Sequence, residues 1–318
     1  MFIDVPISGR AAALLLVISF VLTSQAVAAF SRFLPRDRGR ALAYEGAESK
    51  GKYTSTGILF VSFVGVFCLL ILRLSLEVRL YILAMLFEMV MGFLDDNAKV
   101  PWSELKKGLL DLAGAAFVTI IYMRSNGTMV HLVTLGRSVV LPAPLFFALS
   151  MLLILVSVNV TNITDGVDGL SSSVACTVLL GVLAAGERLH TGADLAPVLW
   201  VFLGALLCYL WFNAKPCTHL MGDAGSRAMG ALIAIAFLKL GAPFLYIPMA
   251  LVFILDGGSS LVKLSTRRYL KRRNFMQHIT TPLHDHVRKR RRWSDEQTVT
   301  RFMICQALLC LLCVLAMK

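Results

Sequence analysis

The chain has 318 residues, of which 57% are hydrophobic and 16% charged, and its mean hydropathy is +0.74. This composition excludes an ordinary water-soluble domain and is typical of a protein that resides in a lipid bilayer. The net charge of +12 fits the basic cytoplasmic loops of a membrane protein, which are attracted to anionic headgroups. We therefore expect no nucleic-acid partner.

Hydrophobic stretches along the chain predict about ten transmembrane helices in a single polytopic domain, residues 1–318. A bilayer core about 30 Å thick needs roughly 20 apolar residues per helix. Long apolar runs without period-two alternation favour helices over a membrane β-barrel, so the expected fold class is an all-α integral membrane protein. The predicted spans are approximately 11–30, 57–75, 78–94, 108–124, 143–160, 172–187, 196–213, 227–240, 242–262 and 300–317.

Basic residues concentrate in alternate loops, and this asymmetry predicts the orientation, because cytoplasmic loops are enriched in Lys and Arg. Five segments carry 23 of the 31 Lys and Arg residues. These segments are 31–56, 95–107, 161–171, 214–227 and 263–301. We expect them in the cytoplasm, with both termini outside and with 263–301 as a basic cytoplasmic loop.

Two acids, Glu88 and Asp256, lie inside predicted spans. Asp256 precedes Gly257 and Gly258 in a span that also contains prolines, so we expect a bent or broken ninth helix. The Asp256 carboxylate could pair with Lys263, face a substrate groove, or form a hydrogen bond between helices.

The first polar motif, FLDDNAK at 93–99, ends the third predicted span. The adjacent carboxylates of Asp95 and Asp96 could raise each other's pKa, hold a divalent cation or accept a proton from a substrate. A solvated helix end is the alternative reading of this motif.

The second motif, NITDGVDGL at 162–170, is a loop rich in Asn, Asp and Gly. Glycines allow backbone N–H groups to approach a ligand. Asn162, Asp165 and Asp168 could bind a metal, ribose hydroxyls or the edge of a base.

The third region contains WFNAKP at 211–216 and MGDAGS at 221–226, where the eighth predicted span begins. Free N–H groups at the start of a helix can bind phosphate, and an adjacent carboxylate can share Mg²⁺ with a diphosphate. Asp223 is therefore the expected Mg²⁺ ligand. Helix capping by Asp223 or Ser226 is the alternative.

The fourth motif, TPLHDH at 281–286, lies in the basic loop. Its two histidines, at i and i+2, do not form a helical zinc pair, so phosphate binding or acid–base assistance is favoured.

Taken together, these motifs resemble the polyprenyl-phosphate N-acetylhexosamine-1-phosphate transferase superfamily. The TPLHDH loop and the signature from Trp293 to Phe302 resemble its muramoyl-pentapeptide branch. The resemblance implies that UDP-MurNAc-pentapeptide and undecaprenyl phosphate react, with Mg²⁺, to give UMP and lipid I for peptidoglycan synthesis. It also implies a bacterial cytoplasmic-membrane enzyme, with its active site facing the cytoplasm, that forms a homodimer.

The resemblance assigns roles to individual residues. Asp95, Asp96, Asp223 and His284 match catalytic positions, with Asp223 as the metal ligand. The expected substrate-binding residues are Lys50, Thr54, Lys99, Asn162, Asp165, Asp168, Asn213, Gly222, Ser226 and His286. Two departures stand out: Asp285 replaces the middle histidine of the usual three, and Leu220 replaces an aromatic residue that often stacks on uracil.

Other functions and mechanisms stay open at this point. GlcNAc-1-phosphate transfer to the same lipid would use the same acids, and a transporter or lipid-binding protein could have similar spans. For the chemistry, direct displacement by the lipid phosphate is favoured over a two-step route through an aspartyl-phosphate.

Overall fold

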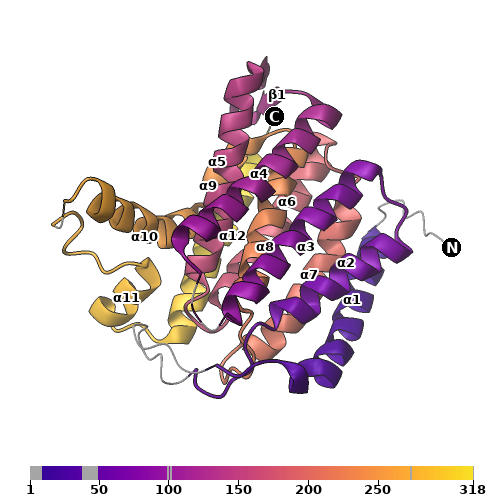
Figure 1. The fold of residues 1–318 in the computed structure, drawn as a ribbon. Coiled ribbons are helices and arrows are strands. Elements are labelled where there is room, and N and C mark those ends of the chain that lie inside the picture. The colour runs from indigo at the N-terminus through magenta and orange to yellow at the C-terminus, as the bar shows by residue number, and fades with distance from the viewer. Residues whose placement is uncertain (1–8, 38–48, 99, 101, 273, 318) are drawn as a thin grey trace.

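The computed structural model describes residues 9–37, 49–98, 100, 102–272 and 274–317, and Lys99 lies outside these residues. The described chain is a bundle of helices with one two-stranded hairpin (Figure 1). The helices are α1 (Gly9–Phe30), α2 (Gly57–Ile71), α3 (Leu76–Asp96), α4 (Glu104–Asn126), α5 (Ala143–Thr164), α6 (Leu170–Leu189), α7 (Ala196–Asn213), α8 (Gly222–Lys239), α9 (Tyr246–Met249), α10 (Leu251–Tyr269), α11 (Leu283–Arg291) and α12 (Asp295–Ala316). Short 3₁₀ helices are η1 (Ser31–Phe33), η2 (Val133–Leu135) and η3 (Pro243–Leu245).

Six helical segments of the described chain are long and apolar enough to cross a bilayer, and a seventh span is possible if a bent helix pair is counted as one. The six are α1 with η1, α4, α5, α6, α7 and α12. The protein is therefore a multi-pass membrane protein by the length and composition of its helices. The expected number of about ten is not confirmed, because α2 has only 15 residues and the charged helices α3 and α8 do not meet the same criteria.

The ninth predicted span, 242–262, is broken, as its prolines and glycines led us to expect. The chain there forms η3 and α9, then turns by 86° into α10. The turn falls at Ala250, not at Gly257, and follows Pro248, which cannot donate a helical hydrogen bond. Gly257 serves close packing instead, since a Cβ atom there would lie 2.5 Å from the Val160 carbonyl oxygen of α5.

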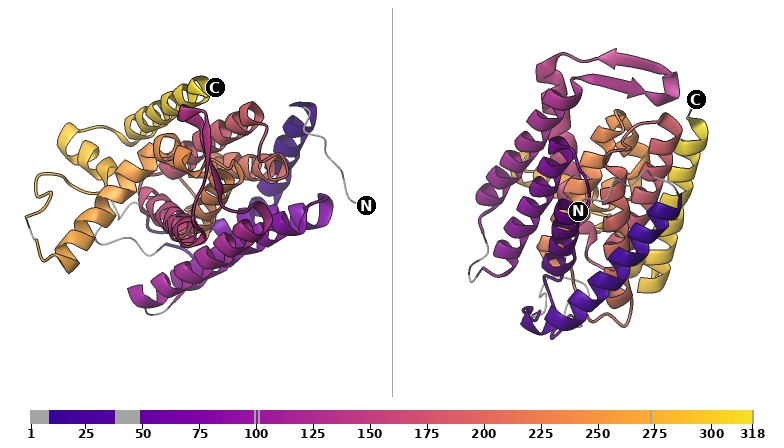
Figure 2. Two further views of the ribbon diagram at one scale, coloured as in Figure 1. Left: turned by 90° about the horizontal axis from the view of Figure 1, so that it is seen from above. Right: turned by 90° about the vertical axis from the view of Figure 1, so that its right-hand side faces the viewer.

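The hairpin is an element that the sequence did not predict. Strands β1 (Met129–Leu132) and β2 (Arg137–Val140) pair antiparallel across η2. The His131 N–H donates to the Gly241 carbonyl oxygen at 2.7 Å, which attaches the hairpin to the end of α8. The hairpin caps one end of the bundle, and α12 also ends on that side (Figure 2).

Helix α8 lies at the centre of the bundle and packs against α2, α3, α4, α5 and α6 (Figure 1). All its residues are buried except Asp223 and Lys239. Small residues make this enclosure possible, because they let helix backbones approach closely. A Cβ atom on Gly92 of α3, for example, would lie 2.4 Å from the Asp223 backbone.

The predicted motifs meet because helices in the bundle alternate in direction. Helices α3, α5 and α7 end, and α2, α6 and α8 begin, at the end of the bundle opposite the hairpin. Helices α10 and α11 project sideways from this region (Figure 1). Loops that are far apart in the sequence therefore form one polar end.

Candidate active site

The Asp96 carboxylate binds the first turn of α8. It accepts hydrogen bonds from the Ser55 hydroxyl at 2.9 Å, from the Asp223 N–H at 3.3 Å and from the Ala224 N–H at 3.5 Å. Gly222 permits this approach, since it has φ +66° and a Cβ atom there would lie 2.3 Å from an Asp96 carboxylate oxygen. The start of α8 thus acts as a binding site for a negative charge, as helix N-termini commonly do.

The Asp223 side chain extends from the same turn toward α5. Its Oδ1 accepts a hydrogen bond from Asn162 Nδ2 at 2.9 Å, and Nδ2 also lies 3.0 Å from the Ser226 hydroxyl. The Ser226 hydroxyl in turn donates to the Gly222 carbonyl oxygen at 3.0 Å. Four predicted site residues, Asn162, Gly222, Asp223 and Ser226, therefore form one network around the first turn of α8.

Asp96 and Asp223 influence each other electrostatically. Asp96 lies beyond Leu94, where the apolar part of α3 ends, and the residue as a whole keeps contact with solvent. Burial of the carboxylate, and to a smaller extent the nearby Asp223 charge, raise the pKa of Asp96 to about 7. Hydrogen bonds from Ser55 and the α8 backbone act in the opposite direction and lower this pKa. Two carboxylates so close together repel, and a cation between them would relieve the repulsion.

Asp95 has other partners. It forms an ion pair with Lys107 of α4, and its Oδ1 accepts a hydrogen bond from the Trp102 N–H at 3.2 Å. The adjacent carboxylates of the FLDDNAK motif therefore face different parts of the structure, and Asp223, not Asp95, is the acid that acts on the Asp96 pKa.

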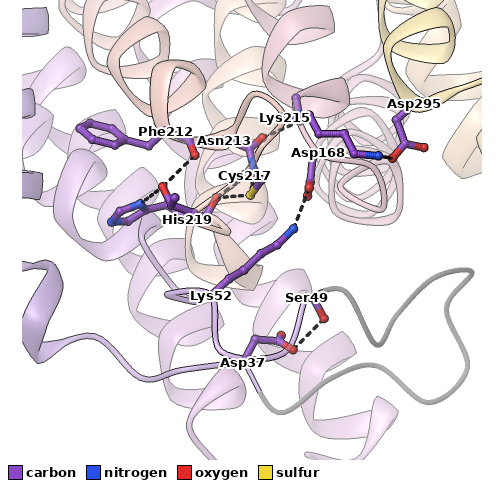
Figure 3. Close-up of polar contacts among 12 residues, drawn as sticks. Asp37, Ser49, Lys52, Asp168, Phe212, Asn213, Lys215, Cys217, His219 and Asp295 are labelled. Carbon is purple, nitrogen blue, oxygen red and sulfur yellow. Dashed lines mark hydrogen bonds and ion pairs between the residues drawn. The ribbon is translucent and has the colours of Figure 1, made fainter.

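The loop after α5 is tied to the first loop, which precedes α2, and to the end of α7 (Figure 3). Lys52 Nζ lies 2.8 Å from Asp168 Oδ2, and Asp165 Oδ1 accepts a hydrogen bond from the Ser171 hydroxyl at 2.5 Å. Asn213 Oδ1 accepts from the Gly169 N–H at 2.8 Å, while its Nδ2 donates to the His219 carbonyl oxygen at 2.9 Å. These contacts fix the shape of the loop around Asp165 and Asp168.

The first loop lies against the segment before α8. The Tyr53 N–H donates to the Thr218 carbonyl oxygen, and the Leu220 N–H donates to the Tyr53 carbonyl oxygen at 2.7 Å. Thr54 is half-buried and Lys50 is exposed in the preceding turn. Leu220 is buried, and the rings of Tyr53 and His219 lie 5.0 Å apart beside it.

His284 is buried and held by Asp256 of α10. Asp256 accepts the His284 N–H through Oδ1 at 2.7 Å, and its Oδ2 lies 2.8 Å from His284 Nδ1. His284 Nε2 faces the loop after α5, because a Cβ atom on Gly166 would lie 2.6 Å from it. His286 Nδ1, by contrast, accepts the Thr280 N–H at 3.2 Å, within its own loop.

Two contacts at this site were not predicted from the sequence. Asp256 pairs with His284, not with Lys263, whose Nζ donates to the Ile279 carbonyl oxygen. Ser55 binds Asp96, and neither contact has a signal in sequence spacing because the partners come from distant segments. The sequence did indicate that Asp256 has a role, because an acidic residue inside an apolar span is a candidate functional residue.

The oxygen donors around Asp96 and Asp223 suit Mg²⁺. Among the described residues, no three His, Cys, Asp or Glu side chains come together as a ready-made metal cluster. Mg²⁺ commonly binds through one or two carboxylates and completes its shell with water and substrate phosphates. Two close carboxylates beside a helix N-terminus fit this pattern.

Comparisons with known proteins show which family the chain belongs to. Residues 78–241 match the model of glycosyl transferase family 4, a range that includes both the α3 acids and Asp223. The phospho-N-acetylmuramoyl-pentapeptide-transferase of Treponema pallidum (strain Nichols) is 38% identical over 296 residues, covering 87% of this chain and 81% of the relative. The proteins of the same name from Borreliella burgdorferi (strain ZS7) and Wolbachia pipientis wMel are 31% and 29% identical, covering 81% and 73% of this chain and 79% and 74% of theirs. The chain therefore belongs to glycosyl transferase family 4 and, within it, to the phospho-N-acetylmuramoyl-pentapeptide transferases.

Proposed function

We propose that this protein transfers phospho-MurNAc-pentapeptide from UDP-MurNAc-pentapeptide to undecaprenyl phosphate, which yields lipid I and UMP for peptidoglycan synthesis. The observation that carries the proposal is the meeting of Asp96 and Asp223 at the start of α8, in a chain 38% identical to a relative with this name. The residues of the sequence motifs gather at one end of the bundle, as expected for an enzyme that joins a soluble and a lipid substrate. A transporter would gather them near its middle.

The proposed setting is the bacterial cytoplasmic membrane, with about ten spans, both termini outside and the active site facing the cytoplasm. The distribution of Lys and Arg supports this orientation. The sideways projection of α10 and α11 supports it as well, because both carry basic residues in their last turns that would lie near anionic headgroups. A homodimer in the membrane is also proposed, on the family resemblance.

In the favoured mechanism, an oxygen of the lipid phosphate attacks the sugar-linked β-phosphate of the nucleotide sugar, the bond to the α-phosphate breaks, and UMP leaves. Asp96 is placed to accept a proton from the lipid phosphate, because its carboxylate faces the start of α8 while Asp95 pairs with Lys107. Lipid phosphate monoesters are largely dianionic at neutral pH, so positioning matters as much as proton removal.

The other residues bind and orient. Asp223, with Asp96 beside it, would hold Mg²⁺, which offsets negative charge on the phosphates when bound. The loop with Asp165 and Asp168 is proposed to bind the nucleotide. His284 Nε2 faces this loop and, with the Nδ1 proton held by Asp256, is placed to accept a proton or a hydrogen bond from a substrate group.

The test is UMP release by the purified protein with undecaprenyl phosphate and either UDP-MurNAc-pentapeptide or UDP-GlcNAc. We expect release with the first nucleotide sugar only, and loss by at least roughly 100-fold in Asp96→Asn and in Asp223→Asn, the size typical of removing a group that stabilises transition-state charge. Glu104→Gln is the matched control, since Glu104 is an exposed carboxylate that pairs with Arg268.

Three outcomes would contradict parts of the proposal. Release with UDP-GlcNAc alone would assign the other sugar substrate. Full activity of Asp223→Asn in Mg²⁺ would remove the metal assignment. Radiolabelled sugar phosphate covalently attached to the protein would establish the two-step route.

A further inference from the structure

Three charged side chains lie inside the bundle below the candidate active site. Glu88 of α3, Asp111 of α4 and Arg227 of α8 are only 3%, 5% and 7% exposed. Arg227 Nη2 lies 3.1 Å from Glu88 Oε2 and also pairs with Asp111 Oδ1. Space for Glu88 comes from Gly114, where a Cβ atom would lie 2.6 Å from Glu88 Oε1.

One of the three residues, Arg227, lies one helical turn from Asp223. Arg227 follows Asp223 by four residues on α8, about 6 Å along the helix axis at 1.5 Å per residue. An acidic residue four positions before a basic one is the arrangement that most favours an ion pair on a helix. Asp223 therefore has a potential intrahelical partner that could neutralise its carboxylate.

Glu88 and Asp111 prevent Arg227 from pairing with Asp223, because they direct the guanidinium away from Asp223 and neutralise its charge. Glu88 and Asp111 hold the guanidinium between α3 and α4, whereas the Asp223 side chain extends toward Asn162 of α5. A buried guanidinium released from both acids would seek another anion, because an unpaired buried charge is costly. Asp223, one turn away, is the nearest carboxylate on the same helix.

We propose that Glu88 and Asp111 are positioning residues that hold Arg227 away from Asp223 and so keep the Asp223 carboxylate available to a divalent cation. This inference rests on the proposed function, in which Asp223 binds Mg²⁺. The three residues have no contact with substrate in this role. Their effect is on cation affinity.

The test compares Glu88→Gln/Asp111→Asn with the triple variant Glu88→Gln/Asp111→Asn/Arg227→Met. In the double variant, we expect the Mg²⁺ concentration for half-maximal UMP release to rise at least about tenfold, with activity recovering at high Mg²⁺. In the triple variant, which has no guanidinium to pair with Asp223, we expect a return to within about twofold of the wild-type value. The single variant Glu88→Gln retains Asp111 as a partner and should shift less.

A second readout does not depend on activity. Mn²⁺ binding to the same purified proteins, followed by electron paramagnetic resonance of free Mn²⁺, should weaken in the double variant and recover in the triple variant. Glu77→Gln is the matched control: Glu77 also links α3 to α8, through Lys239 at 3.1 Å, but at the opposite end of the bundle. It should leave Mg²⁺ and Mn²⁺ dependence unchanged.

The outcomes of these experiments distinguish the positioning role from the proposed function. A folded double variant with wild-type cation affinity, or a triple variant that stays impaired, would overturn the positioning role and leave a structural ion cluster. A wild-type protein that binds no Mn²⁺ would also overturn it. A wild-type protein that binds Mn²⁺ but releases no UMP would contradict the proposed function, while the Mn²⁺ comparison would still test the inference.

Discussion

His284 is held at its backbone N–H and at ring Nδ1 by the single carboxylate of Asp256, and its remaining ring nitrogen faces the loop after α5. A carboxylate in this position selects the tautomer with the proton on Nδ1 and fixes the plane of the ring. The orientation of His284 therefore depends on a residue in the middle of α10.

Asp256→Asn should lower kcat by roughly 10- to 100-fold, the range for losing a carboxylate that orients a histidine in metal sites. The KM for both substrates should change little, because Asp256 itself reaches neither. The measurement is steady-state UMP release at saturating and subsaturating substrate.

Asp285→Asn is the control for this prediction. Asp285 Oδ1 lies 3.9 Å from His284 Nε2, but Asp285 pairs more closely with Lys289, at 3.0 Å, and does not hold Nδ1, so its loss should lower kcat less than the loss of Asp256. Equal losses in the two variants would show that the loop responds to any lost negative charge and that the Asp256 contact has no special role.

The adjacent acids Asp95 and Asp96 show what sequence reasoning could and could not predict at this scale. Their position at the end of an apolar span predicted a polar cluster there, and the structure brings Asp96 next to Asp223. Which acid approaches Asp223 could not be predicted, since it depends on the rotation of α3 about its axis and on the positive φ of Gly222. Sequence spacing contains neither quantity.

At the scale of elements, long apolar runs were sufficient to predict individual long helices. The predicted spans 196–213 and 143–160 correspond to α7 and α5, because about twenty apolar residues in a row have few alternatives to a helix. The bend in the ninth span was predicted, but its position at Ala250 was not. The hairpin was missed, because such a short element depends on tertiary contacts such as the His131–Gly241 hydrogen bond.

The contact between α3 and α8 yields a prediction at this scale. Gly92→Ala should destabilise the protein by about 1–3 kcal/mol, the usual cost of overpacking, because the added methyl group would meet the Asp223 backbone. It should also reduce UMP release by moving Asp96 relative to Asp223. Thermal unfolding in detergent and the activity assay measure both effects.

Gly108→Ala on α4 is the matched control. A Cβ atom at Gly108 has no described atom within 4 Å, so this substitution should stabilise the helix slightly through the higher helix propensity of alanine. If Gly92→Ala were as stable and active as Gly108→Ala, the close approach of α3 and α8 would not be needed to form the site.

The whole molecule has two chemically different ends. The motif loops lie at one end, the hairpin lies at the other, and α8 connects them. The proposed topology places these ends on opposite sides of the membrane. The proposed topology can therefore be tested with a reagent that labels cysteines on only one side of the membrane.

Leu135→Cys, in η2, and Tyr269→Cys, at the end of α10, place cysteines at positions that are 67% and 74% exposed. In a Cys305→Ser background, a membrane-impermeant maleimide should label Leu135→Cys on intact cells and Tyr269→Cys only after permeabilisation. Cys305 is replaced because it is exposed. The reverse pattern would invert the proposed orientation and with it the access of the nucleotide sugar.

The enclosure of α8 has a consequence for biogenesis. A nascent helix that carries Asp223, Arg227 and many small residues has little affinity for lipid by itself, and it is not among the six segments that qualify as independent spans. The helices that surround it on most sides, α2 to α6, leave the ribosome earlier. We therefore expect the translocon to release α8 only after α2 to α6 are in place, so that Asp223 and Arg227 are inserted next to the helices that enclose them.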